Sequence, residues 1–307
     1  MTTDRKFRET LRDMVTGTIR YDEPMCRHTS MGVGGAADIV VWPADIDELR
    51  KIVALLVSRK VPFIPVGNCT NLIVRDGGYR GVIISLKGLE NVAVQEGDEG
   101  SVYIYAQAGV RLSRLVELTV KNALTGLEFC AGIPGSVGGG MKMNAGAYGT
   151  EFKDVVTEAT FIDSDGVMTD VAREFLQFEY RNLRLPVGSI IISAVFGVRK
   201  GLQADIRQHV AKIMDARKKK HPLTLRNAGS IFKNPVGMPA GKVIDEAGLK
   251  GYRIGDAEVS DVHGNFIVNL GGARAQDVLD LMVLVQKNVY DATGLSLEPE
   301  VKIIGDP

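Results

Sequence analysis

The sequence has few cysteines, no excess of either charge and no long apolar run, and each absence excludes a class of protein. Cysteine occurs three times in 307 residues, at Cys26, Cys69 and Cys130, which lie far apart and outside any C-x-x-C spacing. An odd, dispersed set disfavours a disulfide framework and a tetrahedral zinc site, so we predict no metal and a reducing, cytoplasmic environment. Lys plus Arg and Asp plus Glu each number 37, so the formal net charge is zero. We therefore expect no nucleic-acid or membrane partner, and an anionic ligand must meet local donors.

Apolar segments are too short to cross a bilayer. The longest, residues 189–198 (SIIISAVFGV), has about half of the ~20 residues that a membrane helix needs, and we interpret it as a buried strand. The N-terminal stretch MTTDRKFRETLRDMV is charged throughout and lacks the apolar core of a signal peptide. With 45% hydrophobic and 24% charged residues, the composition is that of a globular protein with two or three domains.

Hydrophobic periodicity predicts a mixture of helices and short strands. A charged amphipathic helix opens the chain, and a loop is expected between it and a strand at 37–42. A helix follows over 45–60, where Asp45 and Glu48 have the spacing of a capping box, and a strand at 62–66 completes a βαβ unit. Beyond it, many short strands between 81 and 198 indicate an α+β domain. Further helices are predicted near 111–122, over 204–220 and around 278–289.

One stretch, Gly132–Gly149 (GIPGSVGGGMKMNAGAYG), has seven glycines in eighteen residues. Glycine permits positive φ and close approach of the main chain to a ligand, and Pro134 can rigidify the entry. No lysine occupies a Walker position, so backbone N–H groups would be the phosphate donors. Met141, Met143 and Tyr148 are expected to act as apolar anchors, which argues against a flexible linker. We interpret the stretch as a ligand-binding wall.

Two other glycine-containing segments differ in their surroundings. Gly67–Asn71 connects one predicted strand to another, and its small and amide residues suit an anion-binding nest or an ordinary tight turn. Gly32–Ala37 (GVGGAA) satisfies G-x-G-x-x-A, but no apolar strand precedes it and a strand follows where a helix would be needed. This context disfavours a dinucleotide-binding fingerprint.

Three polar positions are candidates for chemistry. Ser230 in NAGSIFKNP could be a nucleophile, a proton donor or a turn hydroxyl, and the absence of G-x-S-x-G disfavours a hydrolase elbow. Arg181 in FEYRNLRL and Glu300 in LEPEVKIIG, taken alone, fit surface or salt-bridged charges better than catalysts. His263 is expected to be a hydrogen-bonded structural residue.

Six blocks, in order and spacing, resemble the UDP-N-acetylenolpyruvoylglucosamine reductase (MurB) family of peptidoglycan synthesis. They lie between about Thr29 and Gly305 and comprise GNCTNLIV, GIPGSVGGGMKMNAGAYG, FEYRNLRL, NAGSIFKNP, GKVIDEAGLKGYRIGDAEVSDVHGNFIVN and LEPEVKIIG. The resemblance implies an α+β protein with an FAD-binding fold of the vanillyl-alcohol-oxidase type in two subdomains, followed by a small C-terminal α/β substrate domain. The implied limits are 1–85, rejoined by about 298–307, for the first FAD-binding subdomain, 86–200 for the second and 201–297 for the substrate domain.

The resemblance also implies an NADPH-dependent reductase that converts UDP-N-acetylglucosamine enolpyruvate to UDP-N-acetylmuramate with non-covalently bound FAD. In the family, NADPH reduces the flavin, which passes a hydride to the enolpyruvyl double bond. Carried over by motif, Ser230 would donate the proton, and Arg181 and Glu300 would stabilise the enolate-like intermediate. Lys233, Asn234 and Lys218 would meet the uridine diphosphate. The implied FAD contacts come from two loops and an Asn-Ala-Gly segment: Gly67, Asn68, Cys69, Thr70, Asn71, Leu72, Gly132, Ile133, Pro134, Gly135, Ser136, Gly138, Gly139, Asn144, Ala145 and Gly146.

The sequence departs from the family pattern at several positions. Cys69-Thr70 stands where Gly-Ser is common, and Asp256 stands where glycine is usual. The segment between Arg181 and strand 189–198 is too short for the substrate-capping insert of one branch, so we expect the shorter, type II branch. We also predict a monomer. Two alternatives stay open: another FAD oxidoreductase of the same fold that acts on an alcohol or sugar lactone, and a non-catalytic nucleotide-binding module.

Overall fold

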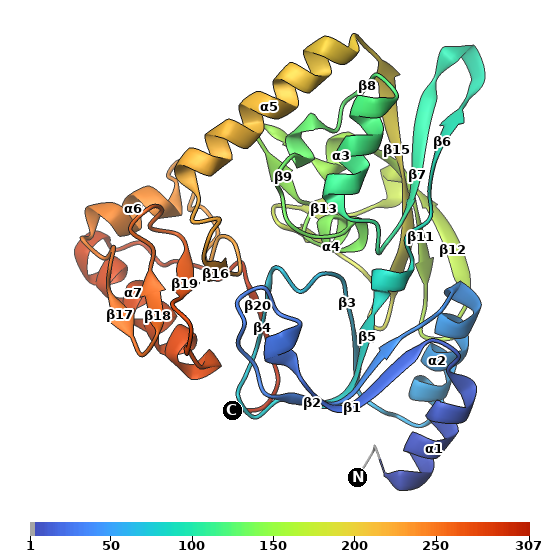
Figure 1. The fold of residues 1–307 in the computed structure, drawn as a ribbon, viewed down its shortest axis with the longest axis horizontal. Coiled ribbons are helices and arrows are strands. Elements are labelled where there is room, and N and C mark those ends of the chain that lie inside the picture. The colour runs from blue at the N-terminus through green and yellow to red at the C-terminus, as the bar shows by residue number, and fades with distance from the viewer. Residues whose placement is uncertain (1–3) are drawn as a thin grey trace. The chain divides into compact units, whose positions relative to one another are not determined.

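The computed structural model describes residues 4–307, and the chain divides into two compact units (Figure 1). The first unit contains the described residues up to Arg20 together with Ile39–Asn68 and Gly81–Ala216. The second contains Tyr21–Asp38, Cys69–Arg80 and Arg217–Pro307. Helices and strands are interleaved in both, which confirms the predicted α+β class. The predicted limits of three domains stay a prediction.

Most of the regular structure belongs to the first unit. Its helices are α1 (Arg5–Met14), α2 (Ile46–Ser58), α3 (Leu112–Lys121), α4 (Val137–Lys142) and most of α5 (Gln203–Lys220). Its strands are β3 (Phe63–Val66), β6 (Val92–Glu96), β7 (Val102–Gln107), β8 (Leu124–Thr125), β9 (Gly146–Ala147), β10 (Thr150–Glu151), β11 (Val156–Ile162), β12 (Met168–Ala172), β13 (Phe178–Glu179), β14 (Asn182–Leu183) and β15 (Ile190–Lys200). The two units share β1 (Thr18–Pro24), β2 (Ala36–Trp42) and β5 (Tyr79–Ser85). Short 3-10 turns are Met25–Arg27, Leu86–Gly88, Asp98–Gly100, Glu128–Cys130, Phe152–Asp154 and Arg173–Phe175.

Helix α2 begins as predicted, although its cap differs from the expected capping box. Asp45 is the N-cap, and its carboxylate accepts a 2.8 Å hydrogen bond from the backbone N–H of Glu48. The Glu48 carboxylate does not return to Asp45 but accepts from the N–H groups of Ala44, Thr16 and Gly17. Burial would raise the pKa of the Glu48 carboxyl, but these backbone hydrogen bonds outweigh it and hold the pKa below its usual value. Glu48 therefore ties the helix to the chain that precedes β1.

The expected loop before strand 37–42 is wrong, because strand β1 lies within it. Its sequence, TIRYDEP, is mostly charged or polar, and only Glu23 is buried along the strand. Such a strand carries little hydrophobic alternation, which is the signal that sequence reasoning uses. Strand β1 takes the edge of a four-stranded sheet with the order β1-β2-β5-β3. The predicted βαβ unit is present as β2-α2-β3, with β5 between its two strands and parallel to β3.

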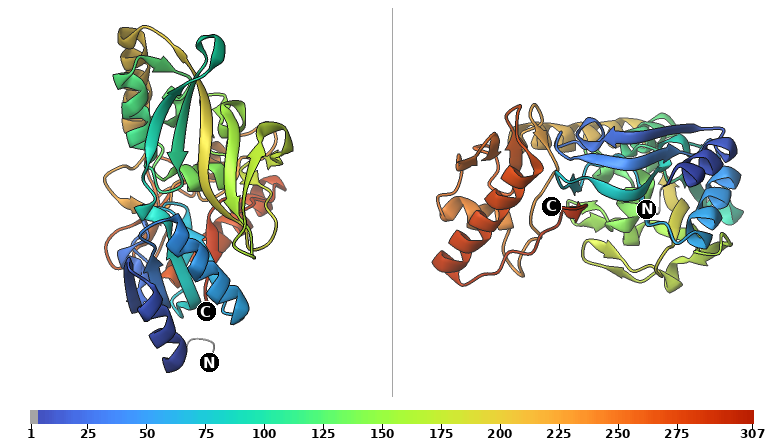
Figure 2. Two further views of the ribbon diagram at one scale, coloured as in Figure 1. Left: turned by 90° about the vertical axis from the view of Figure 1, so that its right-hand side faces the viewer. Right: turned by 90° about the horizontal axis from the view of Figure 1, so that it is seen from below.

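The larger sheet of the first unit has the order β12-β11-β15-β7-β6 and is antiparallel (Figure 2). Its central strand β15 contains all but the first residue of the apolar run 189–198 that was predicted to be a buried strand. Ile190, Ile192 and Phe196 are fully buried along it. A strand that is covered on both faces needs apolar residues at most positions, which explains the run.

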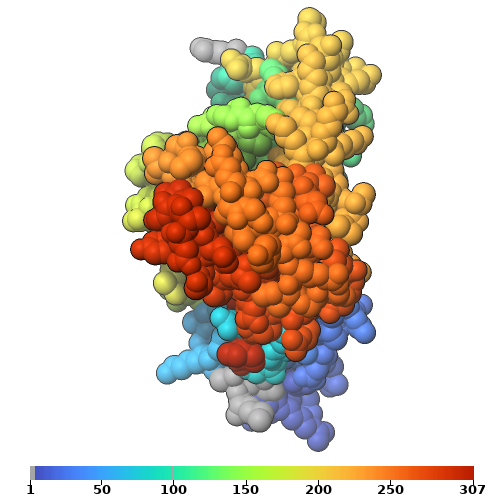
Figure 3. All heavy atoms as spheres, turned by 90° about the vertical axis from the view of Figure 1, so that its left-hand side faces the viewer, coloured from blue at the N-terminus to red at the C-terminus, as the bar shows by residue number. Residues whose placement is uncertain are grey.

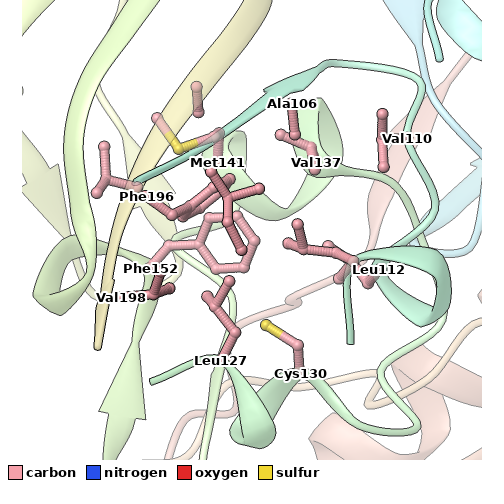
Figure 4. Close-up of a cluster of buried hydrophobic side chains, with 14 of the residues drawn as sticks. Ala106, Val110, Leu112, Leu127, Cys130, Val137, Met141, Phe152, Phe196 and Val198 are labelled. Carbon is pink, nitrogen blue, oxygen red and sulfur yellow. The ribbon is translucent and has the colours of Figure 1, made fainter. Parts of the chain in front are cut away.

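The core of the first unit contains residues of the glycine-rich stretch (Figure 4). Phe152 is fully buried and packs edge-on against Phe129 and Phe196, with ring centroids 6.2 Å and 5.4 Å apart. Val137 and Met141 point into the same cluster and are fully buried. Replacing Phe152 with alanine would lower the free energy of unfolding by about 3–5 kcal/mol. Through Val137 and Met141, helix α4 packs against this cluster.

Tyr148 is not the anchor that was expected. The side chain is 58% exposed, because Tyr148 and Gly149 form the two-residue turn between β9 and β10. Both residues have positive φ, 56° and 85°, as a type I′ hairpin turn requires. The turn conformation sends the Tyr148 side chain away from the core.

The second unit is a small α/β assembly, one face of which is shown in orange and red in Figure 3. Its helices are α6 (Ala240–Glu246) and α7 (Ala275–Thr293), and its strands are β4 (Leu72–Val74), β16 (Arg226–Asn227), β17 (Arg253–Ile254), β18 (Ala257–Val259), β19 (Ile267–Asn269) and β20 (Lys302–Ile304). The antiparallel sheet has the order β16-β19-β18-β17, and β20 pairs in parallel with β4. Helix α7 buries the predicted face: Val278, Leu281, Met282, Val285 and Val289. Among residues 4–307, no helix is both long and apolar enough to span a bilayer.

Candidate active site

The end of β3 and the start of α4 touch in the first unit. A Cβ atom added to Gly67, the residue after β3, would lie 2.3 Å from Oγ of Ser136, which precedes α4. Real Cβ atoms do not approach an oxygen this closely, so Gly67 must lack a side chain while Ser136 keeps its position. The two loops that were predicted to hold a pyrophosphate together therefore meet at Gly67 and Ser136.

The Ser136 hydroxyl has no hydrogen-bond partner in the part of the chain that the structure describes. Its Oγ atom is buried and forms no hydrogen bond with any of residues 4–307. A buried hydroxyl without a partner costs about 1–3 kcal/mol, and a phosphate oxygen is a strong acceptor for it. The neighbouring Gly139 is exposed, and a Cβ there would meet this Oγ at 3.8 Å. The cradle of Gly67, Ser136 and Gly139 fits a phosphate of FAD.

Several amides of the glycine-rich stretch are used inside the protein. The N–H groups of Val137 and Gly138 each donate a 2.9 Å hydrogen bond, to the carbonyl oxygens of Val110 and Ala108 respectively. The N–H of Ile133 donates to the carbonyl of Cys130 at 3.0 Å. Ile133 and Gly138 were predicted to contact FAD, but these two amides are not available as phosphate donors. Main-chain donors must come from other residues of the two loops.

Two of the glycines serve internal packing. A Cβ on Gly138 would lie 2.8 Å from Cβ of Ala108, and a Cβ on Gly140 would lie 2.6 Å from the Phe152 ring. These contacts explain two of the three successive glycines of the short helix α4, where each glycine weakens the helix by about 1 kcal/mol relative to alanine. The stretch is thus partly a close-packed helix and only partly a ligand-facing wall.

The loop after Gly67 continues into the second unit, beginning at Cys69. Cys69 has a φ of 53° and is 7% exposed, although the left-handed region costs about 1–2 kcal/mol for a residue with a Cβ. The carbonyl oxygen of Asn71 accepts from the N–H of Lys302, and the Asn71 side chain donates to the carbonyl of Glu300 at 3.2 Å. The end of this loop is therefore fixed beside the segment that carries Glu300.

Ser230 and Glu300 lie on adjacent, hydrogen-bonded segments of the second unit. The N–H of Glu300 donates to the carbonyl of Ile231, the residue after Ser230, at 2.7 Å. Phe232 forms a bridge with Pro299, and the N–H of Lys233 donates to the carbonyl of Glu298 at 2.8 Å. The side chains of Ser230 and Glu300 are both half-buried. The structure thus brings together two of the three residues that were predicted to be catalytic, and Arg181 belongs to the other unit.

Two asparagines that sequence reasoning missed hold the Ser230 segment. The Asn265 side chain accepts from the N–H of Phe232 and donates to its carbonyl, at 2.9 Å and 2.8 Å. The Asn227 carboxamide oxygen accepts from the N–H of Gly229 at 3.0 Å. Asn227 precedes Ser230 closely enough to be recognised as a turn residue, whereas Asn265 offers no local signal.

The predicted uridine-diphosphate residues also have structural partners. The Lys233 ammonium forms an ion pair with Glu298, and the Asn234 carboxamide oxygen accepts from the N–H of Ala240 at the start of α6. Lys218 is exposed in the last turn of α5, where Arg217 and three lysines complement the helix dipole. Asn234 therefore satisfies one of the backbone N–H groups that are left over at the start of α6.

Arg181 occupies the tip of the two-residue hairpin between β13 and β14, with a φ of 56°. Its guanidinium lies 3.5 Å from the carboxylate of Glu151 and 4.9 Å from the centre of the Tyr180 ring. The Glu151 carboxylate also accepts a hydrogen bond from the buried side chain of Asn144. Sequence reasoning missed Glu151, because its contacts join three segments that no local pattern relates.

His263 is hydrogen-bonded, as expected, and lies beside a second histidine. Its Nδ1 atom accepts from the N–H of Asn265 at 3.1 Å. The rings of His263, His221 and Phe266 pack within 4.9–5.6 Å of one another. Burial, together with the nearby cation Arg217, lowers the pKa of His221 to about 4, and burial also lowers that of His263. Both rings are therefore neutral at physiological pH.

The unusual Asp256 is accommodated by local hydrogen bonds. Its carboxylate pairs with Arg253 and accepts from the N–H of Gly272 at 2.9 Å. The aspartate at this position, where the family usually has glycine, therefore has a structural role.

Within residues 4–307, no group of three His, Cys, Asp or Glu side chains is arranged to bind a metal, and Cys26, Cys69 and Cys130 form no disulfide.

Comparisons with known proteins cover both units. Residues 37–172 match an FAD binding domain family, and residues 221–304 match the C-terminal domain of UDP-N-acetylenolpyruvoylglucosamine reductase. These matches confirm the predicted FAD-binding fold followed by a substrate domain, and they confirm FAD as the cofactor.

Relatives and a solved structure extend over nearly the whole chain. UDP-N-acetylenolpyruvoylglucosamine reductase of Syntrophus aciditrophicus (strain SB) is 49% identical over 98% of this chain and 96% of its own. The protein of that name from Caldanaerobacter subterraneus subsp. tengcongensis is 42% identical over 98% and 97%. The crystal structure of the Thermus caldophilus reductase (MurB) superposes with a TM-score of 0.80 at 35% identity, over 93% of this chain and 99% of its own. The chain therefore belongs to the UDP-N-acetylenolpyruvoylglucosamine reductase family.

Proposed function

We propose that this chain reduces the enolpyruvyl ether of UDP-N-acetylglucosamine enolpyruvate with NADPH, giving UDP-N-acetylmuramate for peptidoglycan synthesis. The chain is an FAD-dependent oxidoreductase, as its family membership indicates. The single structural observation that supports this substrate best is the main-chain hydrogen bond from Glu300 to Ile231, because it joins the segment of the predicted proton donor Ser230 to the segment that carries Glu300.

FAD would be held at the junction of Gly67 and Ser136. The Ser136 hydroxyl and the amides that remain available would bind its pyrophosphate, and the Asn144–Gly146 segment would lie near the flavin. When bound, FAD supplies the redox chemistry, receiving a hydride from NADPH and delivering it to the enolpyruvyl double bond. The protein supplies binding and orientation.

Arg181 would stabilise the charge that develops during the reduction. Hydride addition to an enol ether conjugated with a carboxylate places negative charge on that carboxylate. A fixed guanidinium matches the carboxylate with two parallel N–H donors, which a lysine cannot provide. The side-chain carboxylate of Glu151 already limits the movement of this guanidinium.

Ser230 would donate a proton from Oγ to the carbon next to the one that receives the hydride. Serine is a poor acid in water, so the transfer needs a dry site with positive charge nearby. Glu300 would orient the Ser230 hydroxyl or hold a proton itself, from a segment that is hydrogen-bonded to the one that carries Ser230. Lys233, Asn234 and Lys218 would bind the diphosphate, and Lys233 would exchange Glu298 for it.

The remaining predictions concern context. We expect a member of the shorter branch that acts as a monomer in the cytoplasm on these small molecules. Size-exclusion chromatography with light scattering tests the monomer. Localisation is tested by fractionating cells that express the chain.

The visible spectrum of the purified protein tests the proposed function. We expect a flavin spectrum that anaerobic NADPH bleaches and that UDP-N-acetylglucosamine enolpyruvate restores. Heat or acid should release the FAD, because it is bound non-covalently. If the enolpyruvyl substrate does not restore the spectrum, and an alcohol or a sugar lactone bleaches the oxidised flavin instead, the result would favour the other oxidoreductase. Folded protein that stays colourless with added FAD would overturn the proposal.

A further inference from the structure

The carboxylate of Glu151, the last residue of strand β10, contacts three side chains of the first unit. Oε1 lies 3.5 Å from Nη1 of Arg181. Oε2 accepts a 3.0 Å hydrogen bond from Nδ2 of Asn144 and lies 2.6 Å from Nζ of Lys153. The side chains of Glu151 and Arg181 are each only 19% exposed, so their interaction is largely protected from solvent screening. Glu151 thus links two segments that were predicted to serve different ligands.

Asn144 forms a rigid base for this contact. It is fully buried and has a φ of 39°, an unfavourable conformation that the surrounding structure must maintain. Its side-chain Nδ2 also donates to the carbonyl of Glu179 at 3.0 Å, and its Oδ1 accepts from the N–H of Lys153 at 3.1 Å. Asn144 therefore joins the base of the Arg181 hairpin to the segment that is expected to lie near the flavin.

Arg181 needs such support, because its hairpin is short and strained. A φ of 56° at a turn position normally selects glycine or asparagine. A long arginine side chain at an unsupported turn would sample many rotamers, and ordering them costs up to about 2 kcal/mol. Its Nη2 atom also lies 3.4 Å from the carbonyl oxygen of Gly146. Glu151 and Gly146, which are paired in the β9–β10 hairpin, therefore both restrain the guanidinium.

The geometry between Glu151 and Arg181 allows the arginine to take a second partner. A tight bidentate pair has N···O distances of about 2.7–2.9 Å, whereas this one is 3.5 Å. Lys153 is the closer cation and neutralises much of the carboxylate charge, and its hydrogen bond to Glu151 raises the pKa of Lys153. Glu151 consequently restrains Arg181 without forming a tight bidentate pair with it.

We propose that Glu151 is a positioning residue that orients the Arg181 guanidinium from the Asn144–Gly146 segment. The proposal rests on the proposed function, in which Arg181 meets the substrate carboxylate. It assigns a task to a carboxylate that is not among the predicted site residues. Coupling through Asn144 keeps the arginine in a constant relation to the segment expected beside the flavin.

Glu151→Gln tests the charge, because the amide oxygen can still accept from Asn144. We expect FAD reduction by NADPH to stay within about twofold, and the reoxidation of reduced enzyme by the enolpyruvyl substrate to slow about 10–100-fold, as a misplaced group would cause. Glu151→Asp retains the charge and should be faster than Glu151→Gln. If only shape mattered, the order of the two variants would be reversed, and the proposal would be wrong.

A readout without turnover separates positioning from general damage. The substrate, added to oxidised holoenzyme without NADPH, should perturb the flavin absorbance less in Glu151→Gln than in the parent. FAD content and melting temperature should match those of Glu158→Gln, a control at an exposed carboxylate on β11. An unchanged perturbation together with unchanged reoxidation would overturn the proposal.

Arg181→Lys distinguishes failure of this inference from failure of the proposed function. If Arg181→Lys reoxidises normally, the proposed role of Arg181 itself is wrong. If Arg181→Lys is slow and Glu151→Gln is normal, only the positioning role is wrong. If Glu151→Gln and Arg181→Lys act through the same guanidinium, the variant with both changes should be reoxidised no more slowly than Arg181→Lys alone. If their defects were independent, the two fold-losses in rate would multiply.

Discussion

The amide nitrogen of Glu300 lies 2.7 Å from the carbonyl oxygen of Ile231, so the chain on either side of this hydrogen bond carries Ser230 and Glu300 in a defined relation. Because this link is made by main-chain atoms, a change of either side chain leaves it in place. Side-chain substitutions can therefore test chemistry at this site without disturbing how the segments pair.

Ser230→Ala should separate the two halves of the reaction. NADPH should reduce the bound FAD at nearly the parent rate, while transfer to the enolpyruvyl substrate should slow by about 10²–10⁴, the usual contribution of a positioned acid. Anaerobic stopped-flow absorbance follows each half separately. Ser296→Ala, at an exposed serine of the same unit, is the matched control. Equal losses in both halves would count against a proton-donor role for Ser230.

Ser136→Ala should have opposite effects on the apoprotein and on FAD binding. Removing a buried hydroxyl that lacks a partner should raise the free energy of unfolding of the apoprotein by about 1 kcal/mol. The same change removes a donor to phosphate, so the Kd for FAD should rise about 5–10-fold. Urea unfolding and quenching of flavin fluorescence measure the two effects. A destabilised apoprotein with unchanged FAD affinity would show that the hydroxyl has no part in binding the cofactor.

Gly67→Ala should disrupt the junction of the two loops. The new methyl group would lie 2.3 Å from Oγ of Ser136, so one loop must move and the protein should lose most of its FAD. Gly201→Ala is the control, since a Cβ there meets only ordinary contacts at 3.4 Å and beyond. In the double variant with Ser136→Ala, the nearest atom to the new methyl group is Cβ of residue 136, at 3.5 Å. Part of the FAD content should therefore return. No recovery in the double variant would place the defect elsewhere.

The sequence predicts elements well where burial follows a simple period. Helix α7 presents Val278, Leu281 and Val285 at helical spacing, and β15 is a continuous apolar run. Strand β1 was missed because its alternation is polar. Helix α4 was not predicted because three of its six residues are glycines, and two of them, Gly138 and Gly140, must be small to pack against Ala108 and Phe152. Local propensity is overridden there by a tertiary contact.

The site residues could be predicted only where a recognisable sequence motif contains them. Ser230 and Glu300 were candidates from their local sequences and received their roles from the resemblance, but the pairing of their segments depends on a chain reversal that no local pattern shows. Gly67 and Ser136 each belong to a recognisable loop, but their mutual approach does not follow from either loop alone. Glu151 and Asn265 act through contacts between distant segments, so a single sequence gives no signal for them.

His221→Gln should make stability less sensitive to acid. Burial with nearby Arg217 lowers the pKa of His221 in the folded protein to about 4, whereas the unfolded chain has the usual value near 6.5. Between these values the unfolded chain binds the proton more strongly, so the free energy of unfolding falls as pH drops from about 6.5 towards 4. Because part of the ring meets solvent, which screens its charge, we expect a loss of about 1–2 kcal/mol.

Urea unfolding at pH 7, 6, 5 and 4.5 measures this loss as the difference between parent and His221→Gln. The difference cancels the carboxylates, which titrate in both proteins over the lower part of the range. His209→Gln, at an exposed histidine on α5, should keep the pH dependence of the parent. Parallel curves for parent and His221→Gln would mean that the His221 ring takes up a proton as easily in the fold as in the unfolded chain, and that its packing against His263 and Phe266 does not exclude the charge.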